Sequence, residues 1–110
     1  MDEGRLPAHM EVGGLVRRIN AQGGFATVIR KGEPDAGTIL LVLTENGANL
    51  RVYERMPQVD GKRKWLLSKS QDVDLKEEIN EYLSRRSIQD RDLWIVELDI
   101  PDGERFIPES

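Results

Sequence analysis

The residues best suited to chemistry gather in the stretch Arg30–Gly37, which reads RKGEPDAG. Arg30 lies close in sequence to two acids, Glu33 and Asp35, and Arg17 adds a second guanidinium from the preceding segment. Groups of opposite charge held together can bind an anion or a small polar molecule, and can exchange protons with it. The stretch therefore predicts a polar binding cluster of Arg17, Arg30, Glu33 and Asp35, in a small-molecule or anion sensor or an enzyme.

The same stretch also has the composition of a tight turn. Pro34 has a fixed φ, Asp35 can hydrogen-bond to its own backbone, and Gly32 and Gly37 tolerate a positive φ. A connection between two strands therefore explains most of these residues without a ligand, and it is the competing interpretation.

Several other chemistries are disfavoured by composition. The chain has no cysteine and one histidine, His9, so we expect no metal site, no disulfide and no Ser-His-Asp triad. Gly13 and Gly14 precede Arg17 and Arg18 and could cradle a phosphate, but a tight strand-to-helix turn explains them better. We therefore expect no cofactor and no catalytic residue.

The charge is unevenly distributed. The net charge is −4, made of +2 over residues 1–64 and −6 over residues 65–110. Arg51, Tyr53 and Arg55 alternate along one expected strand, and Arg30 could extend them into a small basic face. Charges that guard a sheet edge would look the same, and the acidic total argues against a nucleic-acid partner.

The length and hydropathy of the chain limit the number of domains and the cellular locations that it can have. A chain of 110 residues without repeats or linkers predicts a single domain over 1–110, with mobile ends at 1–6 and 108–110. The sequence shows neither a signal peptide nor an apolar run long enough to cross a membrane. We therefore expect a cytoplasmic protein with no membrane partner.

Two helices are predicted from apolar spacing. The first covers residues 14–22 and ends at Gly23-Gly24, and a short strand over residues 8–12 is expected to lead into it. The second begins near Asp74 and Glu77, which have capping-box spacing. Its apolar stripe is Leu75, Ile79, Tyr82 and Leu83.

β-branched and aromatic runs predict strands over residues 25–31, 38–45, 48–55, 62–68 and 92–100, and a short final strand over 104–107. Asn46-Gly47 suits a two-residue hairpin loop, which would pair Leu43 with Leu50 and Leu41 with Val52. The run Ile39–Leu43 is apolar without alternation. It therefore predicts a central strand whose second face is covered by long side-chain stems or by a partner.

Together these elements predict an α+β fold: a curved, mainly antiparallel sheet of about five strands with two helices packed on one face. The other face, left partly apolar, is a reason to expect self-association.

Four segments carry a resemblance to a family: Leu15–Arg18, Gly24–Val28, Arg30–Gly37 and Asp92–Glu97. In these segments the chain resembles the small bacterial proteins grouped as domain of unknown function 1491, and the likeness extends over most of its length. Glu33 stands where the family pattern has aspartate. The resemblance implies no particular activity, substrate or cofactor.

Two classes of function follow. The first is a non-catalytic binding or structural module, a homodimer or the ligand of an unknown protein partner, that acts through its sheet face or edge. The second is the sensor or enzyme built on the RKGEPDAG cluster. Nucleic-acid binding through the basic strand face is a weaker third.

Overall fold

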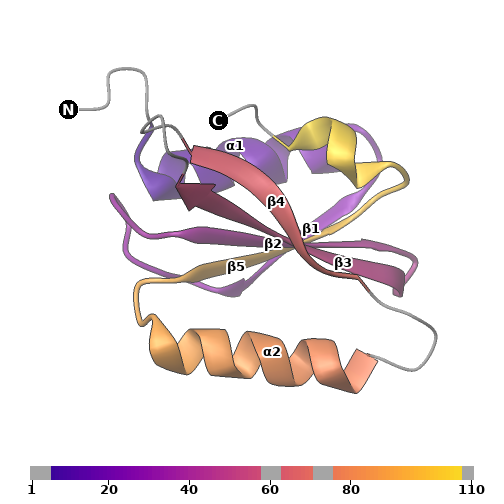
Figure 1. Cartoon of the computed structure of the whole chain (residues 1–110). Coiled ribbons are helices and arrows are strands. Elements are labelled where there is room, and N and C mark those ends of the chain that lie inside the picture. Colours follow the sequence, from indigo (N-terminus) through magenta and orange to yellow (C-terminus); the bar gives the residue numbers. More distant parts are fainter. Residues whose placement is uncertain (1–5, 58–62, 71–75, 108–110) are drawn as a thin grey trace.

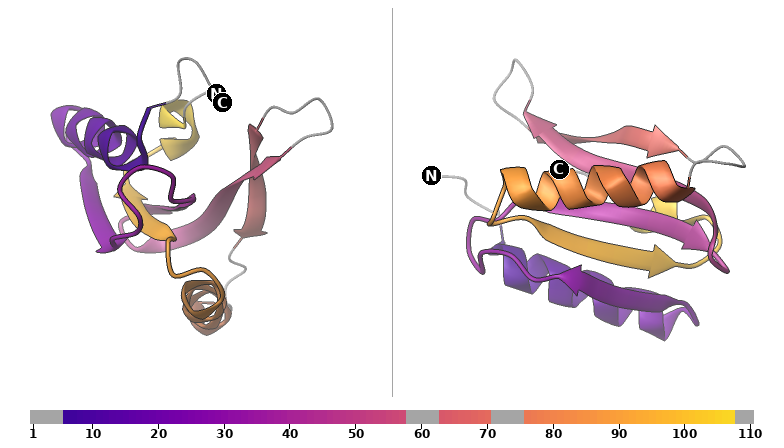
Figure 2. Two further views of the ribbon diagram at one scale, coloured as in Figure 1. Left: turned by 90° about the vertical axis from the view of Figure 1, so that its left-hand side faces the viewer. Right: turned by 90° about the horizontal axis from the view of Figure 1, so that it is seen from below.

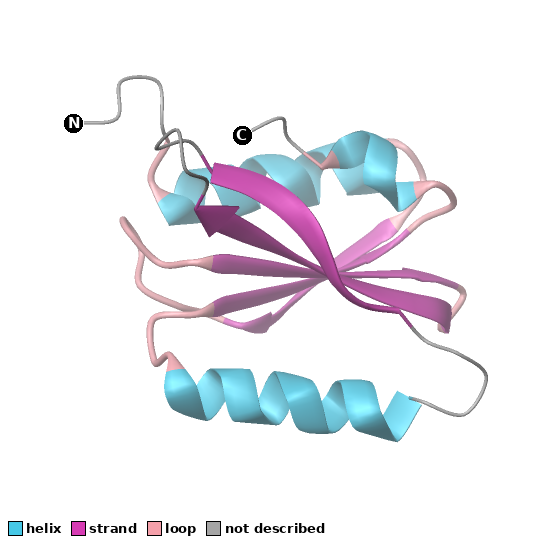
Figure 3. Cartoon of the chain, in the orientation of Figure 1, coloured by secondary structure: helices cyan, strands magenta, loops and turns pink. Residues whose placement is uncertain are grey.

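The structure is a computed structural model that describes residues 6–57, 63–70 and 76–107, and it places a mixed sheet between two helices (Figure 1, Figure 3). The elements are α1 (Ala8–Ala21), β1 (Phe25–Arg30), β2 (Ile39–Glu45), β3 (Ala48–Pro57), β4 (Arg63–Ser70), α2 (Lys76–Gln89), β5 (Trp94–Asp99) and the 3-10 helix η1 (Gly103–Phe106). The predicted α+β class is confirmed.

The strand order is β1-β5-β2-β3-β4. Neighbouring strands are antiparallel except at the centre, where β2 and β5 run parallel with Leu41 opposite Val96. The sheet is therefore mainly antiparallel, as expected, but it is mixed because its central pair is parallel. The chain returns from β4 to β5 through α2, and a crossover of this kind is what permits parallel neighbours.

The two helices cover opposite faces of the sheet, so the prediction that both pack on one face is wrong (Figure 2). Leu41 and Leu43 pack in a cluster with α1, whereas Leu40 and Val42 pack in a second cluster with α2. This arrangement explains why β2 is apolar without alternation. Its second face is covered by α2 rather than by side-chain stems or a partner.

The β2–β3 hairpin turns at Asn46-Gly47 as predicted, with φ of 53° and 78°, and Glu45 lies opposite Ala48. The predicted register beyond the turn is wrong by one residue, because Asn49 also has a positive φ of 55° and the register shifts there. Leu43 therefore lies opposite Arg51 instead of Leu50. This shift turns Arg51 toward α1 and η1, and Leu50 and Val52 toward α2.

Helix α1 begins six residues earlier than expected, at Ala8, so the short strand predicted over residues 8–12 is part of a helix. Gly13 and Gly14 lie inside α1, so they form neither a strand-to-helix turn nor a phosphate cradle at a helix N-terminus. At the other end of the chain, the strand predicted over 104–107 is wrong, since Gly103–Phe106 forms η1.

The second predicted helix is confirmed as α2, with Ile79 buried and Tyr82 and Leu83 packed against the same cluster. Its expected cap Asp74 and first stripe residue Leu75 lie outside the described residues. So do residues 1–5 and 108–110 of the expected mobile ends.

Candidate functional site

The four residues of the predicted polar cluster lie on three different elements, α1, β1 and the β1–β2 loop. Arg17 is exposed on α1, on the side opposite the buried residues. Arg30 ends β1 and donates from Nη2 to the Arg91 carbonyl oxygen at 3.1 Å, whereas Asp35 lies exposed in the β1–β2 loop. Over residues 6–57, 63–70 and 76–107 the structure records no ion pair between Arg30 and Asp35.

The Glu33 carboxylate is bound to its own loop. Its Oε2 accepts the backbone N–H of Asp35 at 2.9 Å and also that of Ala36. The Glu33 carbonyl oxygen accepts the indole Nε1–H of the buried Trp94 at 2.8 Å. Glu33 therefore stabilises the turn and fixes it to β5, while ligand binding by the four-residue cluster stays a prediction.

The RKGEPDAG loop also caps α1. The Pro34 and Asp35 carbonyl oxygens accept the first backbone N–H groups of the helix, from His9 at 2.8 Å and Ala8 at 3.0 Å. The His9 imidazole donates from Nδ1 to the Pro34 carbonyl as well, at 3.0 Å. Because Pro7 supplies no side-chain cap, the loop satisfies helix donors that would otherwise lack a partner.

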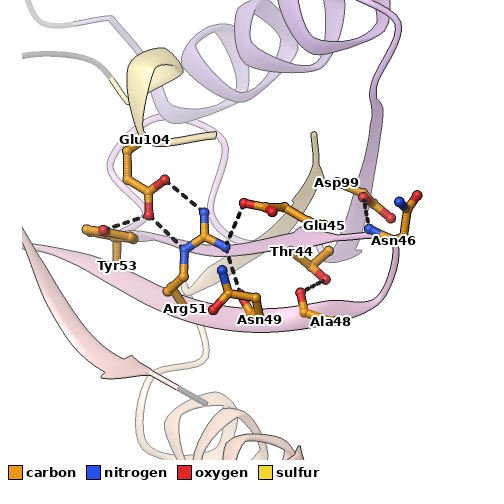
Figure 4. A network of polar contacts seen from close by, with 9 residues as sticks. All are labelled: Thr44, Glu45, Asn46, Ala48, Asn49, Arg51, Tyr53, Asp99 and Glu104. Carbon is orange, nitrogen blue, oxygen red and sulfur yellow. Dashed lines mark hydrogen bonds and ion pairs between the residues drawn. The ribbon is translucent and has the colours of Figure 1, made fainter. Parts of the chain in front are cut away.

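A polar network joins β3 to η1 on the α1 side of the sheet (Figure 4). The Arg51 guanidinium donates to both Glu104 oxygens, from Nε to Oε2 at 2.7 Å and from Nη2 to Oε1 at 2.8 Å. Tyr53 donates its hydroxyl to Glu104 Oε2 at 2.9 Å, and Arg51 Nη1 reaches the Asn49 carbonyl at 2.7 Å and Glu45 at 3.7 Å. Arg51 is thus occupied by protein acceptors in a paired, two-pronged geometry.

This network shifts the ionisation of its members. The hydrogen bonds from Arg51 lower the pKa of Glu104 to about 2 against the desolvation that opposes it. The bond to Glu104 raises the pKa of Arg51, and desolvation followed by the same carboxylate raises that of Tyr53. Shifted ionisation can mark a catalytic site, but here it results from a closed pair that fastens η1 to the sheet.

The predicted basic face is therefore not assembled as expected. Arg51 and Tyr53 do share a face of β3, but Glu104 neutralises it. Arg30 lies on β1, at the opposite edge of the sheet from β3 and β4. The side chain of Arg55 lies outside what the structure describes.

Beneath α2 lies a second polar cluster that sequence reasoning missed. Glu54, 7% exposed on β3, accepts Arg86 Nε at 2.8 Å and Nη2 at 2.6 Å, and also the Tyr82 hydroxyl. Burial works to lower the pKa of Arg86, but the hydrogen bond and charge of Glu54 raise it on balance. The arrangement clamps the C-terminal half of α2 to β3.

The exposed apolar residues point to a different surface, the edge strand β1. Phe25, Val28 and Ile29 are 73%, 42% and 50% exposed. Strand β1 stands first in the sheet order and pairs with β5 on one side, so in the described part of the chain no strand pairs with its other side. One β1 amide has a side-chain partner, since the Ala26 N–H donates to Asn20 Oδ1 at 3.3 Å. Helix α2 lies over the far part of the sheet and leaves β1 outside it (Figure 2).

The two sheet edges differ in charge. Strand β4 at the opposite edge contains Arg63, Lys64 and Lys69, and charges of this kind protect an edge from pairing with other chains. Strand β1 reads FATVIR and has no charged residue before Arg30. The pairing of β1 with β5 is interrupted by a bulge between Val28 and Arg30. The β1 edge is therefore the candidate contact surface of the molecule.

Among the residues that the structure describes, no group of three or more His, Asp or Glu side chains is placed to hold a metal ion. None of the described helices is long and apolar enough to span a bilayer.

The fold and the sequence together place the chain among small α+β proteins, and comparison with known families and structures identifies which family it belongs to. The profile of a protein family of unknown function, DUF1491, matches residues 6–108, and the chain belongs to this family. The expected family membership is therefore confirmed. A search of curated proteins gave no match.

Solved structures of relatives have the same fold. A crystal structure of a DUF1491 family protein from Caulobacter crescentus is 31% identical, with a TM-score of 0.84 over 96% of this chain and 97% of that one. A DUF1491 family protein from Caulobacter crescentus solved by NMR is 30% identical, with a TM-score of 0.81 over 94% of each chain. A solution structure from A. tumefaciens is 29% identical, with a TM-score of 0.77 over 96% of this chain and 99% of that one.

Proposed function

We propose that this protein is a non-catalytic binding module that contacts another protein chain through the free edge of β1. One observation carries the proposal: β1 is a largely apolar strand at the edge of the sheet, without a charged residue before Arg30, and its Phe25 is 73% exposed. An extended segment of another chain can add to such an edge through backbone hydrogen bonds, while its side chains pack beside the exposed ones.

The polar chemistry of the molecule supports a binding role over a catalytic one. Glu104 and Glu54, the carboxylates with the strongest contacts described, each accept hydrogen bonds from an arginine and a tyrosine of the same chain. Groups held this way stabilise the fold and have little freedom to exchange protons with a substrate. We place the binding in the cytoplasm, because a chain without cysteine suits a reducing compartment.

The β1 edge is tested by the Ile29→Lys variant. Ile29 is half exposed, so the change should cost no more than about 0.5 kcal/mol of folding free energy. A lysine on the edge strand should nevertheless oppose strand addition. Immobilised wild-type and variant proteins are incubated with native cell extract, and the captured chains, including copies of the protein itself, are compared. We expect chains that the wild type retains and Ile29→Lys loses.

The matched control is Ile88→Lys. Ile88 is 80% exposed on α2, so this variant adds the same charge and removes the same apolar side chain far from β1. It should capture the same chains as the wild type. Equal capture by all three proteins would refute the β1 edge as the contact surface.

A further inference from the structure

We infer that the chain that occupies the β1 edge is a second copy of this protein, with the two β1 strands antiparallel about a two-fold axis at Thr27. This inference rests on the proposed function and names its partner. The joined sheets would form one continuous sheet through β1 of both copies. Such an interface is isologous, since each copy offers the same surface to the other.

The first argument is the position of the uncharged stretch. Phe25–Ile29 contains no charged residue, and Thr27 is its centre. An antiparallel pairing centred there places Ala26 of each copy opposite Val28 of the other and brings no like charges face to face. Along a strand, the backbone N–H and C=O groups point alternately to one side and to the other. Two identical antiparallel strands related by a two-fold axis must therefore place one residue opposite its own copy, and here that residue is Thr27.

The second argument is charge complementarity between the ends of the edge. Arg30 and Lys31 make one end of β1 cationic. At the other end Phe25 lies opposite Asp99 on the neighbouring strand β5. The two-fold axis brings the cationic end of one copy to the acidic end of the other.

The third argument is the space around the edge. Helix α1 covers one face of the β1–β5 pair, and α2 covers the other face over β5, β2 and β3 but not over β1 (Figure 2). The two-fold axis would therefore place the two α1 helices side by side on one face of the joined sheet, and it would keep each α2 away from the helices of the other copy. Two paired six-residue strands form a small interface, of the class that buries under about 1,200 Å². The dimer should therefore form and dissociate with concentration in the micromolar range.

A cysteine at Thr27 tests the geometry directly, because the natural chain has none and the new thiol would be its only one. Residues directly opposite in an antiparallel pair have Cα atoms about 4.5 to 5.5 Å apart, within the range that a disulfide spans. Under mild oxidation we expect Thr27→Cys to form a covalent dimer at least about tenfold faster than Ser84→Cys. Ser84 is exposed on α2, so Ser84→Cys reports random collision.

Analytical ultracentrifugation gives the second measurement. The wild type and Ile88→Lys should shift from monomer to dimer as concentration rises, while Ile29→Lys should stay monomeric. A wild type that stays monomeric throughout, or equal cross-linking of Thr27→Cys and Ser84→Cys, would overturn the homodimer. If the wild type is monomeric but extract capture still depends on Ile29, the partner is a foreign strand, and the proposed β1 contact stands without its self-pairing.

Discussion

Gly32→Ala is expected to destabilise the protein by about 3 kcal/mol, as insertion of an atom into a close-packed site does. A Cβ at Gly32 would lie 2.1 Å from the Asp92 carbonyl oxygen and 2.7 Å from the Leu93 carbonyl carbon, both backbone atoms that cannot rotate away. The RKGEPDAG loop would have to move off β5, and with it the carbonyl groups that cap α1. Urea unfolding at equilibrium measures the change.

The control for Gly32→Ala is the same substitution at Gly14. That position lies inside α1 and has no atom within 4 Å of its would-be Cβ. Gly14→Ala should therefore stabilise the protein by about 0.5 to 1 kcal/mol through helix propensity. Equal effects of the two substitutions would show that the loop does not pack against β5 as described.

Arg86→Met is expected to lower the free energy of unfolding by about 2 to 3 kcal/mol. The methionine keeps most of the aliphatic stem but removes two hydrogen bonds and the positive charge from the Glu54 carboxylate, whose side chain is only 9% exposed. Removal of the partner cation costs more folding free energy for a carboxylate buried at that depth than for an exposed one, because water cannot solvate the buried charge in its place. Urea titration compares the variant with the exposed neighbour Arg85→Met, which should change stability by less than about 0.5 kcal/mol.

The double variant Glu54→Leu, Arg86→Met separates the charge effect from packing. Replacing both members of a buried ion pair by apolar residues is often close to neutral, so the double variant should regain most of the stability that Arg86→Met loses. If it is no more stable than Arg86→Met, the loss comes from the packing of α2 or from the Tyr82 hydroxyl, which loses its acceptor in the double variant, and not from an unpaired Glu54 carboxylate.

The elements themselves were largely predictable because each depends on local signals. The β-branched and aromatic runs gave the strands, and the Ile79, Tyr82 and Leu83 spacing gave α2. The early start of α1 was not predictable in this way. Its cap consists of the Pro34 and Asp35 carbonyl groups, which come from a loop some 25 residues later in the chain.

The two polar clusters escaped sequence reasoning for different reasons, and the Arg51–Glu104 cluster was missed because of the register shift at Asn49. Without the shift, the side chains of Arg51 and Tyr53 would lie on the face of the sheet that α2 covers, and they would not contact Glu104. The signal was present in the sequence: a second asparagine two residues after Gly47, a residue type that tolerates a positive φ. The Glu54–Arg86 pair joins residues distant in sequence, so no local spacing reveals it.

Placement of the helices on opposite faces could have been inferred from the Ile39–Leu43 run. A strand that is apolar at successive positions is buried on both faces, which is typical of a sheet with helices on each side. The position of β1 at an exposed edge of the sheet could not be predicted from composition or from residue spacing. It depends on the strand order, which places β1 rather than β2 or β5 at the outside.

Amide hydrogen exchange along β1 tests the central claim, that this edge is the contact surface, most directly. Alternate β1 amides face away from β5, and apart from Ala26, whose N–H donates to Asn20 Oδ1, they should exchange rapidly in dilute protein. The account predicts that these amides slow markedly when the protein is concentrated, or when a chain retained by the wild type is added, while the exposed turn at Asn46-Gly47 is unchanged. Unchanged exchange of the outward β1 amides under both conditions would contradict it.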